Sequence, residues 1–233
     1  MKNDYLTPLK ELFETHANQG NAEHMKRYMR DQFEFYGIKT PERKELQKEF
    51  LEKNGFPSAE LLEPIIKELW QLPQREYQYF TVGLMEKVLK SRKPLPKPPQ
   101  EMIALFEYLI TTKSWWDTVD GIAIRLMGFF FQKNPEFIKP CTNKWIQPDN
   151  IWLQRTAILF QLKYKEKTDE ALLFNTIKQF TDSDEFFIQK AIGWALREYS
   201  KTYPQRVIKF VQETPMAPLS KREALKSINK IKR

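Results

Sequence analysis

Five side chains in the second half of the chain could act together on a flat, positively charged group beside a phosphate backbone. Trp116 and Asp120 are four residues apart, so they share a face if their segment is helical. Trp194 stands in the same relation to Lys190, and Arg155 lies midway between Asp120 and Lys190 in the sequence. Aromatic faces and carboxylates attract cations, whereas arginine and lysine attract phosphates. This combination is typical of a site that holds a cationic group next to nucleic acid.

These residues recur at a fixed interval, which indicates the helices that must position them. Residues 150–158 align with residues 185–193 at an offset of 35, and the same offset carried back from Arg155 reaches Asp120. A fainter copy covers residues 218–225, and residues 74–77 are a candidate start of another copy. Paired helices repeated every ~40 residues are typical of a HEAT-like solenoid, in which corresponding positions line one concave face. We therefore expect Asp120, Arg155 and Lys190 on a common surface.

The rest of the chain also has helical spacing of its apolar residues and no convincing strand pair. The pattern predicts an all-α fold with one domain over residues 1–233: a HEAT-like helical-repeat solenoid, which is a curved superhelix of stacked antiparallel helix pairs. Capping residues and prolines predict helix starts at Thr7, Asn21, Thr40, Ser58, Asn134, Asp149, Asp169 and Ser220. The proline-rich residues 91–99 are expected to connect two helix pairs.

The composition disfavours several classes of function. The 233 residues include 38 Lys plus Arg and 30 Asp plus Glu, a net charge of +8 that suggests a polyanionic partner such as nucleic acid or an anionic membrane surface. The 7 glycines form no phosphate-binding motif, and Cys141, His16 and His24 are too few for a cysteine- or histidine-rich metal site. We therefore expect no cofactor and no metal. Because no apolar run of about 20 residues occurs, we also expect a soluble, cytoplasmic protein.

Three longer motifs around these side chains resemble a known family. Residues 114–120 are SWWDTVD, residues 149–155 are DNIWLQR, and residues 187–194 are FIQKAIGW. They resemble the signatures of the AlkD family of bacterial DNA alkylation repair glycosylases, and the resemblance extends from residue 27 to residue 223. It implies a HEAT-like solenoid that removes cationic N3- and N7-alkylated purines, such as 3-methyladenine and 7-methylguanine, from duplex DNA without flipping the base. We expect a monomer whose partner is double-stranded DNA, with no membrane partner.

The resemblance also implies roles for individual residues. Asp120 corresponds to the catalytic carboxylate, Trp116 and Trp194 to the aromatic walls beside the lesion, and Arg155 to a neighbouring arginine that contacts the DNA backbone. Tyr28 corresponds to an aromatic residue near the same cleft. Further candidates for phosphate contacts are the basic residues Lys190, Lys163, Arg197, Lys221 and Arg222.

A single carboxylate suits the chemistry of this reaction. A purine alkylated at N3 or N7 leaves as a neutral molecule, so the group that needs stabilisation is the deoxyribose, which becomes oxocarbenium-like. A carboxylate about 4 Å from that sugar supplies roughly 4 kcal/mol of attraction at an effective dielectric constant near 20.

The alternative is a non-catalytic HEAT-like scaffold that binds DNA or protein, because solenoids are commonly binding modules. Asp120 favours the enzyme, since an acid in a phosphate groove repels DNA and is of no use to a scaffold. We interpret four other tryptophans as core-packing residues and the single cysteine as a buried or semi-buried structural thiol: Trp70, Trp115, Trp145, Trp152 and Cys141.

Overall fold

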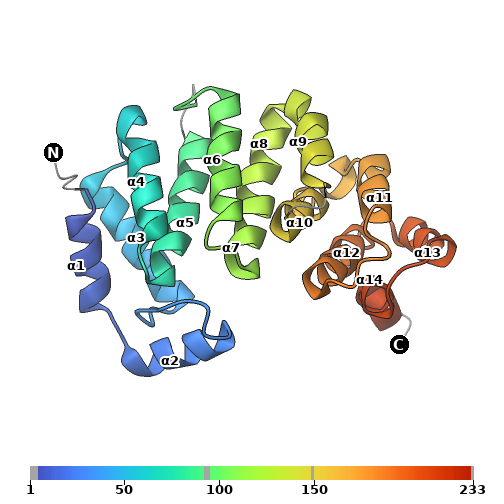
Figure 1. The fold of residues 1–233 in the computed structure, drawn as a ribbon, viewed down its shortest axis with the longest axis horizontal. Helices are drawn as coiled ribbons and strands as arrows, with labels where there is room; N and C mark the ends of the chain where they lie inside the picture. Colours follow the sequence, from blue (N-terminus) through green and yellow to red (C-terminus); the bar gives the residue numbers. More distant parts are fainter. Residues whose placement is uncertain (1–4, 92–94, 148–149, 232–233) are drawn as a thin grey trace. The chain divides into compact units, whose positions relative to one another are not determined.

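The computed structural model describes residues 5–91, 95–147 and 150–231, and within these ranges every regular element is a helix (Figure 1). The pairing of Glu34 with Gln74 is an isolated bridge and forms no sheet. The all-α prediction is therefore confirmed. The chain divides into two compact units, residues 1–105 and 106–233, so the expectation of one domain over residues 1–233 stays a prediction.

The described residues of the first unit form five helices and the start of a sixth. They are α1 (Thr7–Thr15), α2 (Gln19–Tyr28), α3 (Thr40–Asn54), α4 (Ala59–Gln71), α5 (Arg75–Ser91) and α6 (Pro99–Thr111), which crosses the boundary between the units. Glu76 on α5 is fully buried and accepts hydrogen bonds from the backbone N–H groups of Tyr36, Gly37 and Ile38. This carboxylate ties the segment after α2 to α5, because a buried charge needs such partners. The helix α2 itself buries no side chain.

The second unit continues with short helices, of which a first row makes contacts from one helix to the next; the helices that lie between its members in the sequence are called the second row. The first row contains α7 (Trp116–Gly121), a π-helix (Ile122–Met127), α8 (Gly128–Lys133), α10 (Ile151–Leu159), α12 (Phe186–Tyr199) and α14 (Pro218–Ile231). The second row contains α9 (Ile138–Trp145), α11 (Glu170–Lys178) and α13 (Pro204–Glu213), with 3-10 turns at Pro135–Phe137 and Lys165–Lys167. Within the first row, α10 contacts both α7 and α12, and α12 contacts α14 (Figure 1). Buried apolar side chains from α10 to α14 form a core between the rows.

The predicted repeat is confirmed by the helix starts in this unit. Helices α7, α10 and α12 begin at residues 116, 151 and 186, so each start follows the previous one by 35 residues. Asp120, Arg155 and Lys190 are therefore each the fifth residue of their helix. Consecutive first-row helices contact one another, so equivalent positions lie on neighbouring helices. The chain has the helical-repeat fold that the sequence predicts.

Most of the predicted helix starts are close to the observed ones. Helices or 3-10 turns begin at or directly after Thr7, Thr40, Ser58, Asn134 and Asp169, and the side chains of Ser58 and Asp169 accept the expected capping hydrogen bonds.

Two predicted starts are wrong. Asn18, rather than Asn21, caps α2, since the Asn18 side chain accepts from the backbone N–H of Asn21. Ser220 lies inside α14, where its hydroxyl donates to the carbonyl of Gln189 on α12 instead of capping a helix. The predicted start at Asp149 and part of the proline-rich stretch, residues 92–94, lie outside the described residues.

Two further features of the described residues concern membranes and metals. No helix there is both long enough and apolar enough to cross a membrane. No group of three or more His, Cys, Asp or Glu side chains in the same ranges could hold a metal ion. Cys141 is buried, as expected, and burial raises the pKa of its thiol to about 11.

Candidate active site

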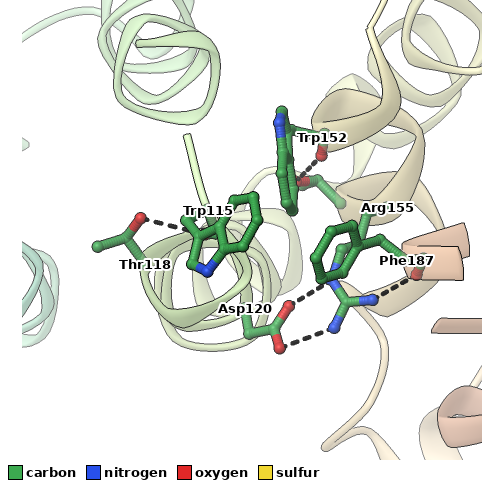
Figure 2. Close-up of polar contacts among 7 residues, drawn as sticks. Trp115, Thr118, Asp120, Trp152, Arg155 and Phe187 are labelled. Carbon is green, nitrogen blue, oxygen red and sulfur yellow. Dashed lines mark hydrogen bonds and ion pairs between the residues drawn. The ribbon is translucent and has the colours of Figure 1, made fainter. Parts of the chain in front are cut away.

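Asp120 and Arg155 form a two-point ion pair between adjacent repeats (Figure 2). Arg155 Nε donates to Asp120 Oδ1 at 2.7 Å, and Arg155 Nη2 donates to Asp120 Oδ2 at 2.9 Å. This fork geometry fixes the plane of the carboxylate as well as its position. The structure therefore joins the acid and the arginine that the sequence placed at equivalent positions of two repeats.

Arg155 also reaches a third helix. Its Nη1 donates to the backbone carbonyl oxygen of Phe187 on α12 at 2.5 Å, so three of the five guanidinium N–H groups have protein acceptors. The Arg155 side chain is only 6% exposed, whereas that of Asp120 is 14% exposed. Of the two partners, the carboxylate is thus the more accessible to a substrate.

The environment of Asp120 acts on its protonation in opposite directions. Burial raises the pKa of Asp120 above its ordinary value, and the nearby charge of Asp117 adds to that increase. The hydrogen bonds and positive charge of Arg155 lower the pKa and partly offset the effect of burial. Arg155 therefore supports the ionised form of a carboxylate that burial alone would protonate more readily.

An aromatic cluster of Trp115, Trp152 and Phe187 lies beside this ion pair (Figure 2). The ring centroid of Phe187 is 5.1 Å from that of Trp115 and 5.0 Å from that of Trp152, and the two tryptophans are 5.8 Å apart. Trp115 and Trp152 are half-buried next to the site rather than in the core. The core-packing interpretation holds for Trp70 and Trp145, which are fully buried.

The helix that carries Asp120 changes its hydrogen-bonding pattern directly after the acid. The π-helix Ile122–Met127 joins α7 to α8, and such segments are frequent at functional sites. At Gly128, an added Cβ would lie 2.6 Å from the carbonyl oxygen of Phe160, just after α10. The Tyr164 hydroxyl donates to the Gly128 carbonyl at 2.6 Å. This close approach holds the Asp120 helix against the segment that follows Arg155.

Of the two tryptophans named as lesion walls, Trp116 lies on the helix of Asp120 and Trp194 on the helix of Lys190. Trp116 is the first residue of α7, one turn before Asp120, and is half-buried. Trp194 on α12 is also half-buried and packs against the apolar core of the second unit. Their helical spacing from Asp120 and Lys190 is as predicted; their contact with a substrate stays a prediction.

Lys190 and Arg197 converge on one carboxylate that the sequence reasoning did not select. Lys190 Nζ lies 3.0 Å from Glu223 Oε1, and Arg197 Nη1 donates to Glu223 Oε2. The hydrogen bond from Lys190 lowers the pKa of Glu223, and burial opposes this shift. An added Cβ on Gly193 would lie 2.4 Å from Glu223 Cβ, so α12 and α14 are in close contact here. These two cations are therefore parts of a junction between repeats.

Within the described residues, Lys163, Lys221 and Arg222 form no hydrogen bond or ion pair with Asp120 or Arg155. Lys163 lies 3.5 Å from Glu198, and its side chain is exposed. Lys221 and Arg222 are exposed on α14, and neither forms an ion pair within the described residues. Tyr28 belongs to the first unit, where it ends α2 with 70% of its surface exposed.

The arrangement can stabilise a cation next to a polyanion. A rigid, partly exposed carboxylate attracts positive charge, half-buried aromatic rings offer apolar and π surfaces, and exposed basic residues attract phosphates.

Residues 9–228 match the sequence model of a family described as "DNA alkylation repair enzyme". The chain belongs to this DNA alkylation repair family. The resemblance found in the sequence is thereby confirmed at the level of the family.

A solved structure agrees with this membership. The protein described as "Predicted DNA alkylation repair enzyme from Enterococcus faecalis" is 35% identical to this chain and superposes with a TM-score of 0.81. The similarity covers 92% of this chain and 97% of that one. A comparison with curated proteins finds no match. Membership of the DNA alkylation repair family supports a role as an enzyme in the repair of alkylated DNA.

Two residues at or near the candidate site were not selected from the sequence. Phe187 occupies the position of Trp152 one repeat later, 35 residues on, so the repeat itself could have indicated a second aromatic residue beside the ion pair. Glu223 lies in the fainter C-terminal copy of the repeat, 33 residues after its partner Lys190. The sequence does not indicate that the backbone carbonyl of Phe187 accepts a hydrogen bond from Arg155, because every residue has the same backbone carbonyl group.

Proposed function

We propose that the protein is a monofunctional DNA glycosylase that excises cationic N3- and N7-alkylated purines, including 3-methyladenine and 7-methylguanine, from duplex DNA. The observation that carries this proposal is the carboxylate of Asp120, partly exposed and held in a fixed plane by Arg155. Within a DNA alkylation repair family, a single oriented carboxylate suits a reaction whose transition state is a cationic sugar.

In the proposed reaction, the charge on the alkylated base makes it a good leaving group. The glycosidic electron pair moves to the base, which departs neutral, and the deoxyribose becomes an oxocarbenium-like cation. Asp120 stabilises this cation and orients the water that attacks C1′; the water oxygen forms the new C1′–O bond, and its extra proton is released to the solvent, which leaves the hydroxyl group of the product. Trp116 and Trp194 contribute aromatic faces, each worth about 0.5 to 2 kcal/mol towards a cationic neighbour. The reaction as proposed needs no metal, no cofactor and no flipped base.

The proposed partner is double-stranded DNA, bound by a monomer in the cytoplasm, where a bacterial chromosome lies. Within the described residues, two further N–H groups of Arg155 have no acceptor, and we assign them to a backbone phosphate. Further phosphate contacts are assigned to Lys190, Lys163, Arg197, Lys221 and Arg222, and Tyr28 is assigned an aromatic contact from the first unit. The exposed cations Lys221 and Arg222 are the best placed of these, because no acid pairs with them within the described residues.

The proposal is tested by incubating the purified protein with methylated duplex DNA and separating the released bases by chromatography. We expect 7-methylguanine and 3-methyladenine in the supernatant, with the rate unchanged by a chelator such as EDTA. Asp120→Asn, which keeps the shape of the side chain, is the matched control and is expected to release neither base at a comparable rate. Tight DNA binding with no release of either base would instead favour the non-catalytic scaffold.

A further inference from the structure

Phe187 contacts the candidate site through two different parts of the residue. Its ring packs against Trp115, which directly precedes α7, and against Trp152 on α10, with centroid distances of 5.1 and 5.0 Å (Figure 2). Its backbone carbonyl accepts the third hydrogen bond of Arg155. One residue on α12 is therefore connected to the helices of both Asp120 and Arg155.

The ring contacts determine where this carbonyl lies. Ring and carbonyl are attached to the same Cα, so a ring held on two sides restrains the main chain at the second residue of α12. Trp115 offers packing rather than a hydrogen bond, since its buried Nε1 has no hydrogen-bond partner within the described residues. The aromatic cluster thus links three consecutive repeats by packing, beside the hydrogen bonds of Arg155 that link the same repeats.

We propose that Phe187 is a positioning residue for the Asp120–Arg155 pair. Docked between the two tryptophans, its ring holds the carbonyl against Arg155 Nη1, which locks the guanidinium plane and, through the fork, the carboxylate of Asp120. The positioning role stands on these contacts alone, and only its effect on excision rests on the proposed function.

The neighbouring residue Phe186 is a matched control. It is also a phenylalanine in the first turn of α12, but it is 52% exposed, and within the described part of the chain its ring contacts no aromatic ring except that of Phe187, at 5.4 Å. Phe186→Ala removes an equal ring without touching either tryptophan. Phe187→Ala and Phe187→Leu both remove the ring that we propose to be essential, and the leucine variant retains most of the apolar volume should the alanine variant fail to fold.

The first experiment measures the exchange of the Arg155 Nε proton with water by NMR, with the signal assigned by its loss in Arg155→Lys. A proton held between two fixed groups exchanges slowly, because exchange needs a local opening. We expect slow exchange in the wild type and in Phe186→Ala, exchange at least ~10-fold faster in the folded Phe187 variants, and recovery in Phe187→Tyr, which restores a ring. Equal exchange in Phe187→Leu and Phe186→Ala overturns the proposal, whether or not the protein excises any base.

The second experiment follows the single-turnover excision rate against pH. The charged groups that act on Asp120 are Arg155 from α10 and Asp117 on its own helix. A loosened Arg155 lowers the pKa of Asp120 less, so this pKa rises further under the effect of burial. The acid limb of the rate profile therefore moves to higher pH in Phe187→Leu and stays in place in Phe186→Ala. A loss of folded protein alone would lower the rate equally at every pH. If the wild type excises nothing, the proposed function is wrong, and proton exchange still decides the role of Phe187.

Discussion

Replacing Asp120 by asparagine removes one negative charge from the site and keeps the shape of the side chain. In the proposed transition state, a carboxylate about 4 Å from the sugar attracts it by roughly 4 kcal/mol at an effective dielectric constant near 20. If the sugar lies on the side of the carboxylate opposite Arg155, the guanidinium that binds Asp120 is about 8 Å from the sugar and repels it by roughly 2 kcal/mol. The substitution deletes the attraction and leaves the repulsion. We therefore expect a loss of about 4 kcal/mol, or roughly 10³-fold in rate.

The assay is single-turnover release of 7-methylguanine from a defined duplex with the enzyme in excess, so that weaker binding cannot imitate a slower reaction. Affinity for the duplex should be unchanged or slightly higher, because the removed charge repels phosphate. The variant should be less stable by about 3 to 5 kcal/mol, since Arg155 is left buried with an uncharged partner. Circular dichroism and the melting temperature show that the variant is folded under the assay conditions.

A double variant tests the electrostatic reasoning separately from the role of the acid. Asp120→Asn combined with Arg155→Gln removes the attraction and the repulsion together. Relative to the wild type, the double variant loses only about 2 kcal/mol of transition-state stabilisation, or roughly 30-fold in excision rate. It should therefore react faster than Asp120→Asn alone. An unchanged single-turnover rate in Asp120→Asn would falsify the role of the carboxylate. A double variant slower than the single one would refute the charge calculation instead.

Four further outcomes are expected. Excision needs ionised Asp120, whose pKa burial raises, so activity should be lost on acidification at a higher pH than for an ordinary aspartate, as a rate profile corrected for spontaneous depurination will measure. Lys221→Ala and Arg222→Ala should each reduce the log–log salt slope of binding to undamaged duplex by about 0.9, and a slope unchanged in both removes α14 from the interface. Gly193→Ala should destabilise the protein by about 1 to 3 kcal/mol in urea unfolding, because its Cβ would lie 2.4 Å from that of Glu223; wild-type stability would mean that α14 moves freely. Bulky cationic N7 adducts should be excised and uracil or hypoxanthine hardly at all, so efficient release of uracil would indicate a shape-selective pocket.

The repeat was predictable because the same packing problem recurs along the chain. Each first-row helix must bury one face against its neighbours, which keeps apolar, aromatic and ionic residues in register. The offset of 35 between residues 150–158 and 185–193 is therefore also the interval between the starts of α10 and α12, and the same interval separates the starts of α7 and α10. The proximity of Asp120 and Arg155 follows from the same register.

The partners of these side chains were less predictable. The sequence places Arg155 on the surface with Asp120, but not in a two-point contact that uses two of its five N–H groups. Lys190 has the equivalent position in the next repeat, but its acidic partner is Glu223, later in the sequence, whereas the acidic partner of Arg155 is Asp120, in the preceding repeat. The pairing of Lys190 with Glu223 depends on how closely α14 approaches Gly193, and this approach is set by the tertiary structure. A residue pattern identifies a face, whereas packing decides which groups on that face meet.

The ion pair resolves a conflict within the proposed function. A lone carboxylate in a DNA-binding surface repels phosphates, yet the proposed reaction needs a negative charge next to the sugar. Paired with Arg155, Asp120 belongs to a unit with no net charge, so at the distance of the backbone the two fields largely cancel. At the sugar they do not cancel, because the more exposed carboxylate is nearer than the buried guanidinium. The pair therefore acts only weakly on phosphates other than the one proposed to contact Arg155, and it attracts a cation that forms only as the glycosidic bond breaks, which is the selectivity for a transition state that catalysis requires.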